Sequence, residues 1–136
     1  AGTPVGGHIG DALEVVSAEA PPTPLSRGEP ATVTVIYRVE RRIPAGYKLF
    51  SHLRSNGRAL NLDHEFVDGL VPAQQLRPGM YVRDVVRLTL PPWFPSGQAV
   101  LQVGLFRRDH RLPVRGPDAV TLRDDHAVKA LTLQVR

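Results

Sequence analysis

The chain has 136 residues, 42% of them hydrophobic, which is enough for one domain with a substantial buried core. Its 13 prolines and 12 glycines are spread between apolar runs, a pattern that favours many short strands over helices. The absence of cysteine excludes disulfides, cysteine-ligated metals and a cysteine nucleophile. The net charge is +4, but acidic residues are interleaved with scattered arginines and no nucleic-acid recognition motif occurs, so composition argues against nucleic-acid binding.

The first half of the chain predicts a lead-in followed by four strands. Residues 1–11 are glycine-rich and are expected to form a flexible lead-in, which leaves residues 12–136 as a single domain. Apolar runs and alternation predict strands at residues 13–18, 31–39, 47–54 and 59–62. Between the last two, Ser55-Asn56-Gly57-Arg58 has the Asn-Gly core of a tight turn, so these strands are expected to form a hairpin.

The second half predicts a long connection and four more strands. Residues 63–79 contain two prolines and two glycines and are expected to cross between sheets or to form a functional loop. Strands are predicted at residues 81–90, 99–106, 120–123 and 128–135. Because turns and loops separate the strands, the sequence predicts an all-β, two-sheet antiparallel sandwich of the immunoglobulin-like kind with seven or eight strands. A closed barrel and a jelly roll are the alternatives.

Asp84 is the first candidate for a chemical role. Alternation in its strand places it on the core face, where a carboxylate needs a hydrogen-bond partner. His52 is the expected partner, and Asp63 and His64 are expected near the same end. Two histidines and carboxylates suit zinc or iron, although the spacing matches no local metal motif. The alternative is a structural network in which Asp84 pins the connection at residues 63–79.

Two other groups are candidates for ligand binding. Trp93 and Phe94 lie in a proline-rich loop, where they form either a stacking platform for a sugar or a partner protein, or a plug over one end of the sandwich. A basic loop is the second group, suited to phosphate, uronic acid or an acidic partner if it is more than a solvated surface. Its residues are Arg107, Arg108, His110, Arg111 and Arg115.

Several short motifs in this order resemble a known domain family. They are Tyr47-Lys48-Leu49-Phe50-Ser51-His52-Leu53, Leu62-Asp63-His64, Leu76-Arg77-Pro78-Gly79-Met80-Tyr81-Val82-Arg83-Asp84, Leu88-Thr89-Leu90-Pro91, Gly97-Gln98-Ala99-Val100-Leu101-Gln102-Val103-Gly104-Leu105-Phe106 and Arg111-Leu112-Pro113-Val114. Together they resemble an extracytoplasmic β-sandwich domain attached to bacterial membrane proteins, including glycosyltransferases of the dolichyl-phosphate-mannose type. Leu76, Met80 and Phe106 depart from that pattern, which has tryptophan, glutamate and tyrosine at these positions.

The resemblance covers about residues 28–114 and implies a non-catalytic accessory domain outside the cytoplasmic membrane. It carries over no catalytic residues, although His52, Asp63 and Asp84 match polar positions of the family. The chain also lacks a nucleophile elbow, a phosphate-binding glycine loop and a metalloprotease motif, so no enzyme activity is expected.

The sequence therefore predicts an accessory or binding module of the bacterial cell envelope. Its expected partner is a glycan or an envelope protein, and no cofactor is expected. One alternative is a metal-binding domain or metal-dependent enzyme that uses His52, Asp63, His64 and Asp84. The other is a purely structural spacer.

Overall fold

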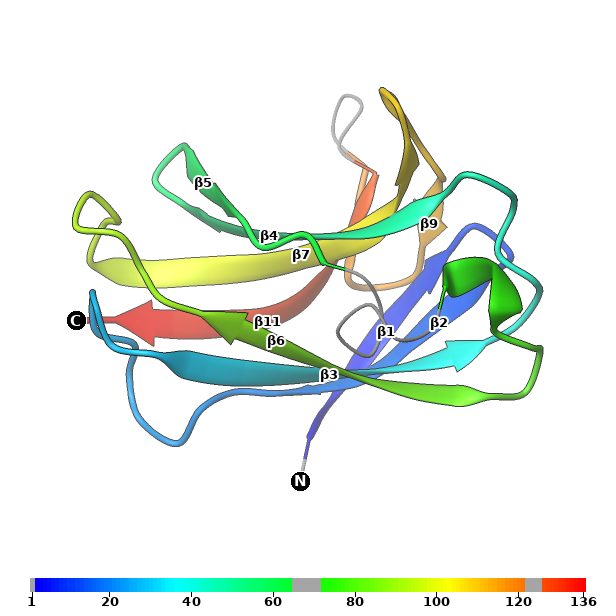
Figure 1. Cartoon of the computed structure of the whole chain (residues 1–136). Coiled ribbons are helices and arrows are strands. Elements are labelled where there is room, and N and C mark those ends of the chain that lie inside the picture. Colours follow the sequence, from blue (N-terminus) through cyan, green and yellow to red (C-terminus); the bar gives the residue numbers. More distant parts are fainter. Residues whose placement is uncertain (1, 65–71, 122–125) are drawn as a thin grey trace.

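Two antiparallel sheets lie one above the other in the computed structural model, which describes residues 2–64, 72–121 and 126–136 (Figure 1). The five-stranded sheet has the order β6 (Tyr81–Leu88), β3 (Ala31–Val39), β2 (Leu13–Glu19), β1 (Thr3–Ile9) and β9 (Val114–Arg115). The six-stranded sheet has the order β10 (Ala119–Val120), β11 (Ala127–Val135), β7 (Gly97–Arg107), β4 (Lys48–Ser55) and β5 (Arg58–Asn61), with β8 (His110–Arg111) paired to the end of β7. The all-β, two-sheet prediction is confirmed.

The core lies between the sheets and follows the predicted alternation. Val33, Val35 and Tyr37 of β3 are at most 1% exposed, and so are Leu101 and Val103 of β7 in the opposite sheet. Each fully buried aliphatic side chain contributes about 1.5–3 kcal/mol relative to an exposed one. The inward faces of the two sheets therefore supply most of the stability, and the outward faces are available for other roles.

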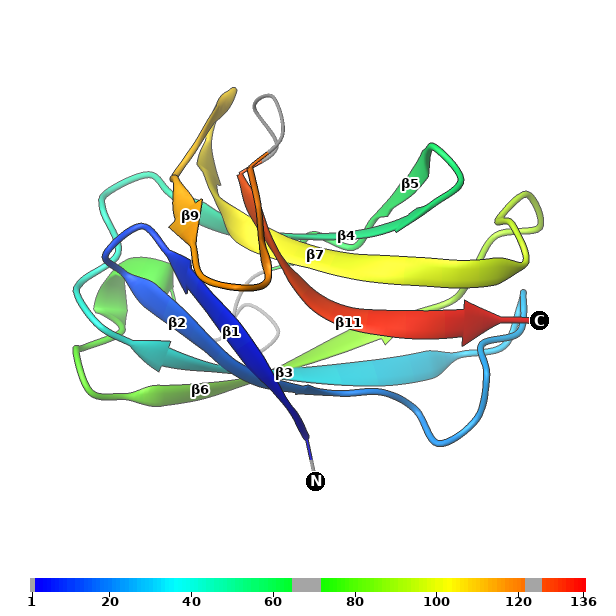
Figure 2. The same cartoon turned by 180° about the vertical axis from the view of Figure 1, so that it is seen from behind.

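Residues 3–9 form a strand, not the flexible lead-in that the sequence predicted. β1 pairs with β2 on one side and with β9 on the other (Figure 2), and Ile9 is completely buried. A Cβ atom on Gly7 would lie 2.4 Å from Cγ1 of Val128, on β11 of the other sheet. Glycine is therefore required for a close approach between the sheets, and the glycines that suggested flexibility mark tight packing instead.

The described residues contain three strands that the sequence did not predict. These are β1, β8 and β9, and they bring the number of strands to eleven where seven or eight were expected. The other eight match predicted strands within about two residues where the structure describes them. The hairpin at Asn56-Gly57 is confirmed, since both residues have positive φ (48° and 74°), as this type of turn requires.

The long connection and the last short strand are described only in part. Residues 65–71 of the predicted connection and residues 122–123 of the predicted strand 120–123 lie outside the described residues. Within the described part, the connection contains a 3-10 turn at Ala73–Gln75, and β10 covers Ala119–Val120. The buried side chains of Ala73 and Leu76 anchor the connection to the core.

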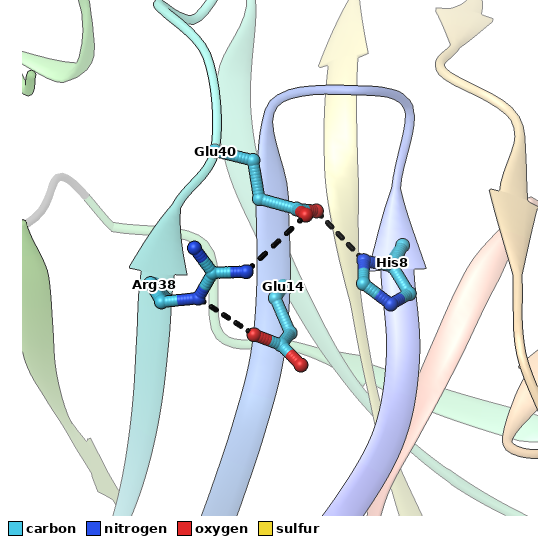
Figure 3. Close-up of polar contacts among 4 residues, drawn as sticks. All are labelled: His8, Glu14, Arg38 and Glu40. Atoms are coloured by element: carbon cyan, nitrogen blue, oxygen red, sulfur yellow. Dashed lines mark hydrogen bonds and ion pairs between the residues drawn. The ribbon is translucent and has the colours of Figure 1, made fainter. Parts of the chain in front are cut away.

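The outer face of the five-stranded sheet carries charges that pair with one another (Figure 3). Nε of Arg38 donates to Oε1 of Glu14 at 2.8 Å, and a second guanidinium nitrogen lies 3.4 Å from Oε2 of Glu40. Nδ1 of His8 lies 2.7 Å from Oε1 of Glu40. These contacts join β1, β2 and the end of β3, so carboxylates match the cations on this part of the face.

We predict that Gly7→Ala lowers the free energy of unfolding by about 1–3 kcal/mol, because the new methyl group overlaps Val128. Urea denaturation measures the loss, and Gly7→Ala combined with Val128→Ala should lose less than the sum of the two single substitutions. A flexible lead-in would instead leave the unfolding free energy unchanged.

Candidate functional site

A buried aromatic ring lies on the outer face of the six-stranded sheet. Alternation along β4 sends Leu49 and Leu53 into the core between the sheets and places Phe50 on the opposite face, where it is still only 1% exposed. The residue opposite Phe50 on β7 is Gly104. A Cβ atom at Gly104 would lie 2.3 Å from the Phe50 ring, so the ring occupies the space that a side chain on β7 would otherwise fill.

Three other side chains surround this ring. The guanidinium carbon of Arg111 lies 4.1 Å from the Phe50 ring centroid, in a cation–π contact. Phe106 meets Phe50 edge to face with centroids 6.2 Å apart, and the His52 ring lies 5.0 Å away. The result is a compact aromatic and cationic cluster on a sheet face that faces away from the core.

A pocket of about 350 Å³ opens beside this cluster. In Figure 1, β5 at one end and the gold hairpin after β7 at the other rise on the same side of the sheet. The residues that line the pocket are Phe50, His52, Asn61, Asp63, Phe106, Arg108, Asp109 and Arg111. They come from β4, β5, β7 and β8 and from the segments that follow β5 and β7, so the sheet itself positions the site.

Asp63 is held in a defined position at the edge of this pocket. β5 ends at Asn61, and beyond it Oδ1 of Asp63 accepts a hydrogen bond from the backbone N–H of Ser51 at 2.8 Å. The backbone N–H of Asp63 in turn donates to Oδ1 of Asn61 at 2.7 Å. The carboxylate thus takes the place of the backbone acceptor that a neighbouring strand would offer to Ser51 of β4. Its second oxygen accepts no hydrogen bond within the described residues and is available to a ligand.

His52 lies beside Asp63, and its burial favours the neutral form. Nε2 of His52 is 3.5 Å from Oδ1 of Asp63. Burial lowers the pKa of His52, with smaller lowering effects from Arg111 and Arg54, and the Asp63 charge opposes them. A neutral imidazole both donates and accepts hydrogen bonds, so His52 adds one donor and one acceptor to the pocket wall.

The buried carboxylate of Asp84 pairs with His64, not with the expected His52. Asp84 is 1% exposed, and its two oxygens lie 2.7 and 2.9 Å from Nε2 of His64. Nδ1 of His64 lies 2.8 Å from the carbonyl oxygen of Leu62. Both ring nitrogens therefore face acceptors, an arrangement that suits an imidazolium beside an ionised carboxylate. The prediction of His52 as partner was wrong because His52 points to the outer face.

This pair joins the two sheets at one edge. His64 follows β5, the edge strand of the six-stranded sheet, and Asp84 lies on β6, the edge strand of the five-stranded sheet. Burial raises the pKa of the neighbouring Tyr37 well above its ordinary value, and the Asp84 charge raises it further. The four predicted polar residues thus form two separate pairs, and only His52–Asp63 faces the pocket. Among the described residues, no three His, Asp or Glu side chains converge on a position suited to a metal ion.

The five residues predicted to bind a ligand fall at opposite ends of β7. Trp93 and Phe94 precede this strand, whereas Arg107 ends it and Arg108 and Arg111 follow, so the eleven extended residues of β7 separate the two groups by about 35 Å. Phe94 is buried (2% exposed), as the plug alternative requires, whereas Trp93 is 45% exposed and the Arg58 guanidinium carbon lies 5.6 Å from its ring centroid. The pocket therefore includes Arg108 and Arg111 but not Trp93.

Sequence reasoning missed the apolar floor of the pocket and two of its polar residues. Phe50, Phe106, Asn61 and Asp109 were not among the candidates. One signal was present, because the strand at 47–54 carries a large apolar residue, Phe50, on the face opposite Leu49 and Leu53, although only one face can meet the core. Gly104 on the neighbouring strand stands where alternation places an outward side chain. Together with Phe50 it could have indicated a ring packed across the outer face of the sheet.

Comparison with protein-family models and with curated proteins finds no significant match to this chain. The described residues form no helix that is long and apolar enough to cross a membrane. The geometry of the site is therefore the basis for assigning a function.

We predict that His64→Ala lowers the free energy of unfolding by about 3 kcal/mol, because it leaves the Asp84 carboxylate buried without its imidazole partner. Chemical denaturation at pH 7 measures the loss. Replacing both residues with leucine removes the charge together with its partner and should recover most of the stability. If the single substitution costs nothing, the pair does not hold the sheets together.

The lowered pKa of His52 predicts a pH-dependent stability with a definite sign. As the pH falls below about 6.5, the unfolded chain binds a proton at this residue before the folded chain does, so acidification lowers the free energy of unfolding. His52→Asn should remove this dependence. The unfolding free energy of the wild type minus that of the variant should thus decrease between pH 8 and pH 5. If this difference increased instead, the Asp63 charge would raise the pKa of His52 by more than burial lowers it.

Proposed function

We propose that this chain is a non-catalytic saccharide-binding module whose site is the pocket on the outer face of the six-stranded sheet. The observation that carries the proposal is the lining of this pocket. An aromatic floor of Phe50 and Phe106 is surrounded by hydrogen-bonding side chains held on four strands and the segments that follow them. Concave sites that combine an aromatic surface with convergent polar groups are typical of small-ligand recognition.

The polar groups suit a ligand that carries hydroxyl groups. Each hydroxyl donates one hydrogen bond and accepts up to two, so a saccharide needs donors and acceptors side by side. The pocket offers both, since Arg108 and Arg111 donate, Asp63 and Asp109 accept, and neutral His52 does either. Phe106 offers an aromatic surface for the C–H groups of a sugar ring.

The cellular setting of the proposal is the bacterial envelope. The resemblance of residues 28–114 to extracytoplasmic accessory domains supports this location. We further propose an immunoglobulin-like arrangement of the strands, which the two facing antiparallel sheets support. A glycan of the envelope is then the expected ligand.

A glycan array followed by calorimetry tests this function. We predict that Phe106→Ala weakens binding of the best glycan about tenfold or more, because Phe106 lines the pocket. Trp93→Ala is the matched control, since it removes an exposed aromatic residue at the opposite end of β7 and should leave the affinity unchanged. Thermal unfolding of both variants verifies that the fold is retained.

Two results would contradict the proposal. Loss of binding in Trp93→Ala but not in Phe106→Ala would move the site to the other end of the sandwich. Failure to bind any glycan on the array would favour the alternative of a structural spacer.

A further inference from the structure

A second pocket of about 600 Å³ adjoins the first, and Phe106 and Arg108 line both. Gly46, Lys48 and Arg107 complete its lining. This second pocket therefore presents three cationic side chains and one phenyl ring, and no carboxylate of the described residues lines it. The two pockets meet at Arg108, at the tip of the β7–β8 hairpin.

Among the residues that the structure describes, no carboxylate pairs with Lys48, Arg107 or Arg108 of the second pocket. β4, β5, β7 and β11 contain no Asp or Glu, although they carry five Lys or Arg residues. Within the described part of the chain, neither Lys48 nor Arg108 forms an ion pair. This differs from the outer face of the other sheet, where Arg38 meets two carboxylates (Figure 3).

Arg107 is positioned in advance for a ligand. Its guanidinium carbon lies 4.9 Å from the ring centroid of Tyr47, and one of its N–H groups donates to the carbonyl oxygen of Ala45 at 3.4 Å. Tyr47 is 5% exposed, so the ring is a fixed support. An arginine held in this way loses less freedom on binding an anion than a freely moving side chain would.

Arg108 occupies a backbone conformation that disfavours it. Its φ is +58°, in the left-handed region that glycine and asparagine adopt readily and that strains a long side chain. At its other two-residue hairpin the chain has Asn56-Gly57, the residues that such a turn favours. At Arg108 the chain thus has a residue that the turn disfavours, and this residue places a cation between the two pockets. Residues that disagree with their local conformation in this way are frequent at functional sites.

We infer that the ligand is an anionic saccharide whose charged group lies among Lys48, Arg107 and Arg108 while its sugar ring lies in the adjoining pocket. This inference rests on the proposed saccharide-binding function. Arginine recognises the carboxylate of a uronic acid and the oxygens of a phosphate or sulfate ester by the same paired hydrogen bonds. A single-stranded nucleic acid is less suitable, because successive bases need a series of aromatic platforms. Among the described residues, Phe106 is the one aromatic ring that lines the second pocket.

The test compares matched acidic and neutral saccharides by calorimetry. One pair is an oligomer of galacturonic acid and the galactose oligomer made by reducing its carboxylates. A second pair is a sulfated oligosaccharide and its unsulfated parent, so the two pairs separate carboxylate from ester as the source of charge. In at least one pair the acidic member should bind about tenfold tighter or more, and this advantage should shrink as salt is raised.

Arg108→Asn separates binding from folding. Asparagine suits the left-handed conformation, so the melting temperature should stay the same or rise. The preference for the acidic saccharide should fall about tenfold, to near the level of the neutral partner. Lys48→Gln, a substitution at an exposed position of β4, should reduce the same preference without affecting the fold.

Each other outcome has a distinct meaning. Equal binding of acidic and neutral saccharides would overturn this inference and leave the saccharide-binding proposal standing. An unchanged preference in Arg108→Asn would also overturn it, and so would tighter binding of a single-stranded oligonucleotide of equal charge. Failure of every saccharide to bind would instead overturn the proposed function itself.

Discussion

The packing of Phe50 across Gly104 is the constraint on which the proposed site depends. A sandwich needs one buried face on each sheet, and the outer faces are free to be polar. Here a buried ring also occupies the outer face of the six-stranded sheet, in the space that the missing Gly104 side chain leaves. Arg111 covers the ring and Phe106 borders it. This packed ring forms the floor beside which the polar residues of the pocket lie, on the strands and on the segments that follow β5 and β7.

The charges of the two sheets are arranged differently. On the five-stranded sheet, Glu14 and Glu40 lie beside Arg38 and His8, so these two side chains are paired with carboxylates. On the six-stranded sheet, β4, β5, β7 and β11 contain no acidic residue, and Lys48, Arg107 and Arg108 line the second pocket. Like charges repel one another in a folded chain, so a group of cations without nearby carboxylates lowers the stability of the fold. A bound anion would relieve this repulsion, which favours a ligand site on this sheet and not on the other.

Period-two alternation predicted the class of fold, most of the strands and the inward direction of Asp84. It did not predict β1, because glycines required for close packing look the same in sequence as glycines of a flexible segment. It placed Asp84 with His52 because alternation identifies the face of a strand but not the segment that crosses above it, and His64 fills that position. Separation of the Trp93 loop from Arg108 follows from the length of β7, whereas the shape of the pocket depends on tertiary contacts that no local pattern encodes.

Mapping a bound ligand by nuclear magnetic resonance tests the central claim most directly. Titration of the isotopically labelled protein with a galacturonic acid oligomer should shift the backbone amides of Phe50, Asn61, Phe106 and Arg108 together, and leave the indole N–H of Trp93 in place. Shifts centred on Trp93, or spread over the outer face of the five-stranded sheet, would contradict the account.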